Sequence, residues 1–451
     1  MRALPKISRL TIIDLLSFCT GSHCTGSYWS GMANYNAIWN LNSPGPQNSK
    51  TNMITNVLVL EESLVSLWGL SSGERISRQL EEIGEVELIT QESGLPSRGR
   101  VLLLNGHFLF EIRTIAGLLQ LKNTVLVHPG DNRPAAAIVD SKFVAACTDY
   151  MTGRSGASPD MLACIVPDDL AAFDQALLSA KTPLLEPVFE ENSQEMENLL
   201  YGNAYKGITD LVTKFLWPRP ARKLVQITAN LGLTPNRVTS IGLVLVIAAC
   251  YLFLHGHYLA GLTAGWVMTL LDTVDGKLAR VTVQSSKFGH LFDHAIDLIH
   301  PPFWYIFWGM SLSGFQPVAG IDRVDMYWMI VIGYVAGRLV EGLFPLLGNC
   351  NVFTWKPFDA YFRLVTARRN PCLIILTFGA IIGRPDWGFT AVAMWTVLST
   401  LILFVRLLQG LFSRLSQGPL DSWLNAESVA MGPNARAFRL FGSTRGAYAG
   451  Q

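Results

Sequence analysis

Four aspartates lie close together in the second half of the chain, between positions 272 and 297. Asp272 and Asp275 are three residues apart, and Asp293 and Asp297 are four apart. Each pair would therefore lie on one face of a helix, and two adjacent helices could bring all four carboxylates to one point. Because carboxylates so close repel one another, a hard divalent cation such as Mg²⁺ or Mn²⁺ is the expected partner.

The residues between these aspartates favour a phosphate ligand beside the metal. Gly276, Ala279 and Gly289 are small, which leaves space for a nucleotide to approach both helices. Lys277 and Arg280 offer positive charge for phosphate. A cation next to small and basic residues is typical of a pyrophosphate site.

Together these residues resemble the signature of the CDP-alcohol phosphotransferase family, D-x2-D-G-x2-A-R-x8-G-x3-D-x3-D. The chain matches it at every fixed position, with Asp272, Asp275, Gly276, Ala279, Arg280, Gly289, Asp293 and Asp297. The segment TPNRVT, from Thr234 to Thr239, also resembles the one that opens the first membrane span in that family. The resemblance covers about residues 206–409.

The resemblance implies a role for each of these residues. Asp272, Asp275 and Asp293 would bind two divalent ions, Mg²⁺ or Mn²⁺, that hold the pyrophosphate of a CDP-linked donor. Asp297 would share in metal binding and act as general base on an acceptor hydroxyl, which attacks the β-phosphorus and expels CMP. The residues expected near the CMP are Gly276, Lys277, Ala279, Arg280 and Gly289. As in the family, a homodimer active in phospholipid or polar headgroup synthesis is expected.

A second group of basic residues follows the fourth hydrophobic segment, namely Lys356, Arg363, Arg368 and Arg369. The guanidinium fork suits bidentate phosphate contacts, and inositol-phosphate users of the family place arginines near here to bind an acceptor phosphate. The alternative is that these residues hold lipid headgroups on the cytoplasmic side. Arg338 and Glu341, three residues apart, form either an ion pair that orients this pocket or a purely structural pair.

The composition is that of a polytopic membrane protein. Half of the 451 residues are hydrophobic and only 15% are charged, and the apolar residues concentrate after about position 238. A net charge of +1 argues against a nucleic-acid partner. The seven cysteines form no CxxC pair, which argues against a disulfide framework or a structural zinc site.

Six hydrophobic segments predict six transmembrane helices, at 240–254, 258–271, 290–311, 326–347, 372–382 and 387–408. Before them, residues 206–237 mix Lys and Arg with Trp and Leu at helical spacing, which predicts an amphipathic helix in the headgroup region. Lys and Arg lie mainly on the side of the aspartates. We therefore expect a multi-pass protein of a bacterial or archaeal cell membrane, with its active site facing the cytoplasm.

A soluble α/β domain, Rossmann-like and with parallel strands, is predicted before the membrane segments. The predicted strands are NVLVLEE, EVELIT, RVLLLNG and TVLVHPG, and the predicted helices are ERISRQLEEI, EIRTIAGLLQ and DDLAAFDQALL. TVLVH and AAAIV, which flank PGDNRP, predict a hairpin on the edge of the sheet.

This arrangement resembles the bifunctional enzymes that couple an inositol-phosphate cytidylyltransferase to a di-myo-inositol-phosphate phosphate synthase. The chain departs from that pattern where a glycine-rich loop is expected, and it has Asn105, Gly106 and His107 where a metal-binding Asp should end a strand. The interpretation is a degenerate nucleotidyltransferase-like domain with a regulatory or structural role, in which Arg75 and Arg78 could still bind a nucleotide.

The predicted organisation has five parts. Residues 1–52 are disordered or follow from a mis-called start, 53–190 form the α/β domain, and 191–237 form a linker and the interfacial helix. Residues 238–410 form the six-helix membrane domain, and 411–451 form a disordered cytoplasmic tail.

Two alternatives stay open at this stage. Within the family, the donor could be CDP-diacylglycerol or a soluble CDP-polyol, whose phosphate would go to a polyol phosphate or a lipid hydroxyl. Outside the family, acidic residues within membrane spans also mark ion pathways, so a divalent metal-ion transporter is the competing class.

Overall fold

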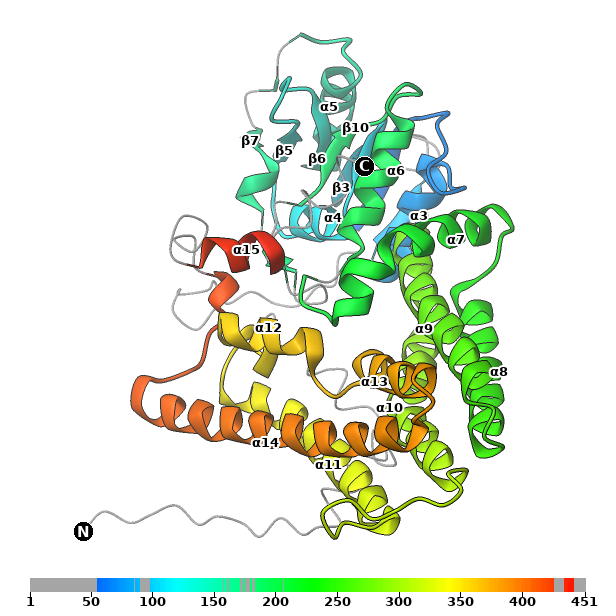
Figure 1. Ribbon diagram of the computed structural model, residues 1–451. Helices are drawn as coiled ribbons and strands as arrows, with labels where there is room; N and C mark the ends of the chain where they lie inside the picture. The colour runs from blue at the N-terminus through cyan, green and yellow to red at the C-terminus, as the bar shows by residue number, and fades with distance from the viewer. Residues whose placement is uncertain are drawn as a thin grey trace, which may run out of the picture. The chain divides into compact units, whose positions relative to one another are not determined.

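The computed structural model describes residues 55–84, 86–89, 98–156, 158–159, 162–170, 173–174, 179–180, 183–205, 207–425 and 434–441 (Figure 1). The prediction for residues 1–52 lies outside this described part of the chain. Within it, an α/β region is followed by a region built from helices, as the sequence predicts.

The α/β region is built on a six-stranded sheet with the order β2-β1-β3-β6-β5-β7. The strands are β1 (Thr55–Glu62), β2 (Val86–Ile89), β3 (Arg100–Gly106), β5 (Thr124–Val127), β6 (Pro134–Asp140) and β7 (Ala163–Ile165). β1 runs parallel to β2 and β3, whereas β6 is antiparallel to both β3 and β5. The predicted hairpin of β5 and β6 is confirmed, but it is not at the edge of the sheet, because β7 pairs with β5.

Helices cover both faces of this sheet. On β3, Leu102 and Leu104 pack in one cluster with α3 (Ser72–Ile83) and α4 (Ile112–Leu119). The alternate residues Val101 and Leu103 pack in a second cluster with α5 (Val144–Met151). A strand buried on both faces reads as a continuous apolar run, and RVLLLNG has this character.

The predicted helix at 168–178 is wrong where the chain is described. Pro167–Asp169 form a single 3-10 turn (η3), and β8 (Phe173–Asp174) pairs antiparallel with β9 (Ser179–Ala180). Leu170 is buried against Gly117 of α4 and has an extended backbone. The burial of this one side chain ends the turn before a helix can form. The short β4 (Phe108–Phe110) and β10 (Leu185–Pro187) then pair at the end of the region.

The predicted acidic linker is instead α6 (Ser193–Asn203), which buries Met196 and Tyr201. The predicted amphipathic helix follows as two elements, a π-helical turn η4 (Val212–Leu216) and α7 (Pro218–Asn230). Pro218 has no N–H to continue the first element, but it suits the first position of a new helix. α7 is amphipathic, with Ala221 and Val225 buried. Its place in a headgroup region stays a prediction.

Helices lie at all six predicted membrane positions: α8 (Pro235–Leu254), α9 (Tyr258–Val281), α10 (Lys287–Met310), α11 (Arg323–Leu343), α13 (Arg369–Ile381) and α14 (Pro385–Gln417). Among the described residues, α8, α11 with its extension to Leu347, and α14 are long and apolar enough to cross a membrane. A fourth span results if α12 (Pro357–Val365) and α13, bent by 44°, are counted together. α9 and α10, which carry the aspartates, are not among these candidate spans. The prediction of six spans is therefore not confirmed.

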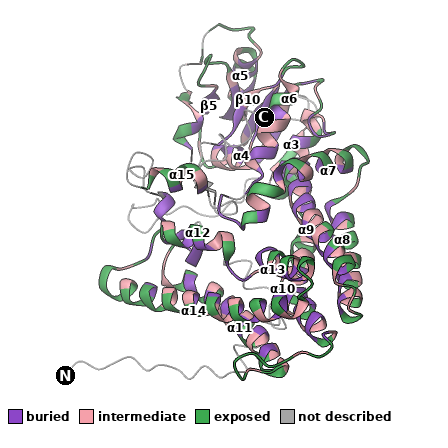
Figure 2. Cartoon of the chain, in the orientation of Figure 1, coloured by how far each residue is buried: buried purple, intermediate pink, exposed green. Residues whose placement is uncertain are grey.

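The helices pack around a core of aromatic residues. Trp304 and Trp308 of α10 are fully buried, and their indole N–H groups donate to the carbonyls of Val246 and Pro385 at 3.1 and 2.9 Å. Large apolar residues such as Ile247 and Phe412 are exposed in these helices. Exposed segments, coloured green, recur along α8 and α14 (Figure 2). Such a surface is expected where lipid takes the place of water.

The prediction of a disordered tail from residue 411 is wrong for 411–425 and 434–441. α14 continues to Gln417, and η7 (Trp423–Asn425) and α15 (Ala435–Phe441) follow. Leu420, Trp423 and Phe441 are buried in one cluster with residues of α12. The composition of this segment is mainly polar and small, so no local pattern indicated that its few apolar residues pack against distant parts of the chain.

Candidate active site

Three of the four motif aspartates converge. Asp272 comes from α9, and Asp293 and Asp297 come from α10. One carboxylate oxygen of each lies within 4.8 Å of the others, and all three residues are half-buried. The two helices therefore place three hard oxygen donors at one point, which is a suitable donor set for Mg²⁺ or Mn²⁺.

Asp275 lies outside this group of three. It is buried, and its carboxylate accepts hydrogen bonds from Thr239 Oγ1 and from the backbone N–H of Gly276, both at 2.6 Å. Thr239 is on α8, in the segment TPNRVT. The hydroxyl of a third helix thus holds Asp275 beside the site, and its predicted role as a metal ligand stays a prediction.

Arg369, predicted to bind the acceptor phosphate, contacts the aspartates instead. Its Nη2 lies 2.5 Å from Asp272 Oδ2, and its Nη1 lies 2.5 Å from Asp297 Oδ1. The bend between α12 and α13 brings it there, at the first residue of α13. One guanidinium thus neutralises two carboxylates that would otherwise repel each other. Positive charge at this point is what a bound divalent ion would also supply.

The two basic residues of the motif contact the C-terminal end of α6. Lys277 Nζ donates to the carbonyl of Ala204 at 2.6 Å and lies 3.4 Å from the ring centroid of Tyr205. Arg280 Nη1 donates to the same carbonyl at 3.2 Å and to the carbonyl of Gly276 at 2.9 Å. Cations at a helix C-terminus complement its dipole. Both charges lie one or two turns beyond the aspartates, and contact with a nucleotide stays a prediction.

The small residues of the motif differ in their surroundings. A Cβ on Gly289 would lie 2.3 Å from Asn236 Oδ1 and 2.8 Å from Ser286 Oγ, so a larger residue there would require these polar side chains to move. A Cβ on Gly276 would meet only Arg280, at 3.6 Å. Ala279 is half-buried on the same helix. Gly289 is thus in tight contact with polar side chains of α8 and of the residue before α10, whereas Gly276 leaves open space beside Asp275.

Three further arginines that the sequence placed at the acceptor pocket are called the arginine cluster here: Arg338, Arg363 and Arg368. Glu341 accepts an ion pair from Arg368 on one oxygen and from Arg338 on the other, the latter at 2.8 Å. Arg363 and Arg368 lie 5.4 and 5.5 Å from the ring centroid of Phe353. Lys356 is exposed and lies over Trp355 at 5.4 Å, and no contact of it with the cluster is seen among the described residues.

The sequence did not predict Asp210, whose charge acts on Arg363. Its buried carboxylate accepts from the backbone N–H of Thr213 at 3.0 Å and from Asn370 Nδ2 at 2.9 Å. Burial would raise the pKa of Asp210, but the charge of Arg363 and these hydrogen bonds outweigh burial and hold the pKa below its usual value. An acid within the apolar context of YKGITDLV was the available signal.

Several polar atoms around the arginine cluster are buried and have no hydrogen-bond partner within the described chain. They are Nε of Arg338, Nη1 of Arg363, Nε of Arg368 and Oδ1 of Asn370. A buried donor without a partner costs roughly 1–3 kcal/mol. Three guanidinium groups with free donors can be satisfied by an anion such as a phosphate.

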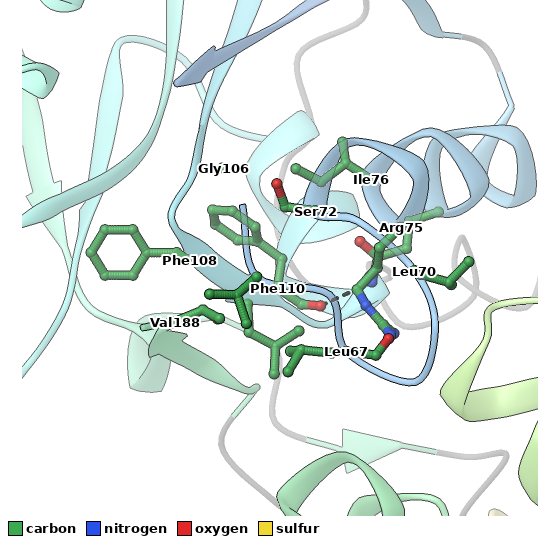
Figure 3. A pocket seen from close by; sticks show the side chains of 12 residues that line it. Leu67, Leu70, Ser72, Arg75, Ile76, Gly106, Phe108, Phe110 and Val188 are labelled. Atoms are coloured by element: carbon green, nitrogen blue, oxygen red, sulfur yellow. Dashed lines mark hydrogen bonds between the residues drawn. The ribbon is translucent and has the colours of Figure 1, made fainter. Parts of the chain in front are cut away.

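The α/β region has a pocket where β1 and β3 end (Figure 3). It is lined mainly by apolar side chains, among them Leu67, Leu70, Ile76, Phe108, Phe110 and Val188. Its volume of about 20 Å³ holds roughly one water molecule. No room is left for a nucleotide between these side chains.

Both arginines predicted for nucleotide binding are engaged elsewhere. Arg75 Nη2 donates to the carbonyl of Leu67 at 3.0 Å, and Arg78 Nη1 donates to that of Thr282 at 2.8 Å. Burial, and less strongly the charge of Arg78, lowers the pKa of Arg75 to about 10. Arg75 thus serves as an internal hydrogen-bond donor in this structure.

Comparison with known proteins supports the motif. Residues 232–405 match the family model of CDP-alcohol phosphatidyltransferases. Archaetidylinositol phosphate synthase of Pyrococcus horikoshii is 35% identical over 116 residues, 26% of this chain and 57% of that protein. A putative cardiolipin synthase of Mycobacterium tuberculosis is 33% identical over 128 residues, 27% of this chain and 54% of that protein.

A third relative is phosphatidylinositol phosphate synthase of Mycobacteroides abscessus, 26% identical over 135 residues, 29% of this chain and 61% of that protein. The chain thus spans little more than half the length of these relatives. The matched residues begin at 232, so the nucleotidyltransferase likeness of the α/β region lies outside them and stays a prediction. The metal-transporter alternative finds no support in these matches. We conclude that residues 232–405 form a CDP-alcohol phosphatidyltransferase domain.

Proposed function

We propose that this protein is a membrane-embedded CDP-alcohol phosphotransferase of phospholipid or polar headgroup synthesis. It transfers a substituted phosphate from a CDP-linked donor to an acceptor hydroxyl and releases CMP. The observation that carries this proposal is the convergence of Asp272, Asp293 and Asp297, within 4.8 Å of one another, inside the matched domain. We further propose that the site faces the cytoplasm of a bacterial or archaeal cell and that the protein acts as a homodimer.

The aspartates are the residues that would hold the divalent ions. Two Mg²⁺ or Mn²⁺ ions would supply charge neutralisation of the donor pyrophosphate. Asp272 and Asp293 offer carboxylate oxygens to this site, and Asp275, which is held by Thr239 and lies on the same helix as Asp272, is the third proposed ligand. Bound cations would neutralise the carboxylates that Arg369 neutralises in this structure, which would leave its guanidinium able to contact an anionic substrate.

Asp297 is the general base in this proposal. It takes the proton from the acceptor hydroxyl, whose oxygen forms a bond to the β-phosphorus as the bond from that phosphorus to the bridging oxygen breaks. CMP leaves with the bridging oxygen. Lys277 and Arg280 lie on the same helix as Asp272 and Asp275 and supply positive charge for the phosphate of the leaving CMP.

The arginine cluster favours an acceptor that itself carries a phosphate. Its three guanidinium groups face two acids, Glu341 and Asp210, and retain buried donors without partners in the described chain. Two of the relatives are named as synthases of inositol phosphate lipids. We therefore infer a phosphorylated polyol as acceptor and a lipid-linked CDP donor. A soluble CDP-polyol as donor is the second candidate.

The proposal is tested by CMP release from the purified protein in Mg²⁺ or Mn²⁺. CDP-diacylglycerol and CDP-inositol are compared as donors, against free and phosphorylated inositol and glycerol and against phosphatidylglycerol. The expected result is release with CDP-diacylglycerol and a phosphorylated polyol. If no pair releases CMP, the proposed function is wrong.

The Asp297→Asn variant tests the proposed base. We expect CMP release to fall by about 10³-fold or more, because the amide cannot take the proton, while the CDP donor still binds. The matched control is Asp149→Asn, which changes an exposed carboxylate of α5. If Asp297→Asn retains transfer, the base must be another group.

A further inference from the structure

A C-terminal segment, which we call the strap, packs against the elements that surround the arginine cluster. We define the strap as the described residues 418–425 and 434–441. It lies beyond the residues that match the family model, which end at 405. Its contacts are with η6 (Val352–Thr354), α12 and the segment that precedes α7.

The strap is held first by its backbone. The N–H of Asn349 donates to the carbonyl of Leu420 at 2.7 Å, and the N–H of Leu420 donates to the carbonyl of Leu347 at 3.3 Å. Gly348 lies between them, and a Cβ on it would be 2.2 Å from the backbone N and O of Leu420. Its extended backbone, with φ of 170°, would suit any residue. A side chain at 348 would therefore meet the backbone of the strap first and push it away.

The strap then packs against the floor of the arginine cluster. Leu420, Trp423 and Leu424 are buried in one cluster with Phe353 and Trp355. Ser422 Oγ donates to the carbonyl of Thr354, the residue after Phe353, at 3.0 Å. The ring of Phe353 is the surface on which Arg363 and Arg368 lie. Strap contacts thus fix the aromatic ring that orients two of the three arginines.

The far end of the strap reaches the two elements on either side of Arg363. Phe441 is fully buried, with its ring edge-on to Tyr361 of α12 at 5.0 Å. The ammonium of Lys214 lies 5.2 Å from the centroid of the same ring. α12 carries Arg363, and Lys214 follows Asp210, whose charge acts on Arg363. Phe441 thus contacts both the helix that carries Arg363 and the segment that carries Asp210.

We propose that the C-terminal strap positions Phe353 and α12, and through them the arginine cluster, for the phosphate of the acceptor. Strap residues are positioning residues that touch no substrate. This inference rests on the proposed function for the identity of the reaction. It predicts that the strap governs use of the phosphorylated acceptor and not of the CDP donor.

The first test is Gly348→Ala in the full chain, with Gly342→Ala as matched control. Gly342 is exposed at the end of α11, with no atom within 4 Å of an added Cβ. We expect Gly348→Ala to raise KM for the phosphorylated acceptor about 10-fold or more, with kcat and the KM for CDP donor changed less than twofold. The control is expected to match the wild type. An equal loss with donor and acceptor, or no change, would overturn the inference.

The second test removes an anchor of the strap and restores its shape in part. Trp423→Ala is expected to raise the same KM, and Trp423→Phe to recover most of the affinity, because the phenyl ring still fills the buried site next to Phe353. A general loss of folding would lower kcat for both variants and leave KM unchanged. Such a result would show that Trp423 serves stability alone.

A third measurement does not depend on turnover. Inorganic phosphate, added to metal-free protein, should raise the Tm of the wild type by binding the arginine cluster. The half-maximal phosphate concentration should rise about 10-fold in Gly348→Ala and stay unchanged in Gly342→Ala. If the wild type shows this shift but no CMP release, the proposed function fails while the strap inference stands. If Gly348→Ala gives the wild-type shift, the strap inference fails.

Discussion

Both regions of this molecule have charged side chains at positions that the sequence predicted to bind a ligand. The surroundings of these side chains differ between the two regions. In the α/β region, leucine and phenylalanine side chains fill the space at the ends of β1 and β3, and Arg75 donates a hydrogen bond to the carbonyl of Leu67. In the helical region three carboxylates stand within 4.8 Å of one another and only a guanidinium separates two of them. In the first arrangement the charged side chain has its hydrogen-bond partner within the chain and little space is left for a ligand. The second places three carboxylates around one guanidinium, so negative charge remains in excess there, and we take this excess as the mark of a site for chemistry.

The comparison is tested most severely by removing one carboxylate. Asp293→Asn is expected to reduce CMP release by about 10³-fold or more, because a divalent ion loses a charged ligand and the pyrophosphate loses its neutralising charge. The Tm should stay close to that of the wild type, because asparagine has the size of aspartate and keeps a hydrogen-bond acceptor at this position. Measurements of CMP release and Tm check both. A variant that is inactive because it unfolds would contradict this account.

A smaller effect is expected from the arginine cluster. Arg368→Met removes a charged donor from the proposed acceptor site and should raise KM for a phosphorylated polyol by about 10 to 100-fold. Arg338 still pairs with Glu341 in this variant, so no carboxylate is left unpaired. Arg133→Met, at the tip of the β5–β6 hairpin, is the matched control. Steady-state kinetics with each acceptor separate the two outcomes, and equal KM values would remove Arg368 from the acceptor site.

The α/β region is predicted to affect stability without affecting the rate per folded molecule. Ile76 lines the small pocket and is buried, so Ile76→Val should lower the free energy of unfolding by about 1 kcal/mol. CMP release per folded protein should not change. Ile330→Val, in the helical core, is a substitution of the same kind and should destabilise by a similar amount. Loss of activity in Ile76→Val alone would give the α/β pocket a part in the reaction.

The smallest effect concerns Lys214, whose ammonium donates to the carbonyl of Gly207 at 2.9 Å. Burial lowers the pKa of Lys214 from 10.5 to about 8. Between these two values the unfolded chain binds more protons than the folded chain, so stability rises with pH across this window. The Tm of the wild type should therefore rise relative to that of Lys214→Met between pH 8 and 10. A constant difference would show that the lysine keeps its ordinary pKa.

The sequence predicted what depends on local spacing. Asp293 and Asp297 share a face of α10 because residues four apart always do, and the strands of the α/β sheet follow from apolar runs. The family match to residues 232–405 bears out the meaning of the eight-residue signature. The roles assigned to single residues remain predictions, to be decided by the experiments above.

What depends on long-range contacts was not predictable in this way. Arg369 contacts the aspartates from the first residue of α13, directly after the 44° bend from α12, and such a bend cannot be read from local spacing. The predicted helix after Pro167 is prevented by the burial of Leu170 against α4. The tail that contains the strap was predicted to be disordered because it has many Gly, Ser, Ala and Asn residues, whereas the five residues Leu420, Trp423, Leu424, Ala437 and Phe441 are buried in one cluster.

The length of α14 has a consequence for how the lipid surroundings act on this protein. Its 33 residues span about 50 Å, whereas the hydrocarbon layer of a bilayer is about 30 Å thick. The excess is taken up by tilt or by a part that rises out of the membrane. The strap begins where α14 ends, at Gly418, whose N–H donates to the carbonyl of Arg414. A thinner or thicker bilayer would change the tilt of this helix and with it the height of that junction, so membrane thickness would set the tension on the strap.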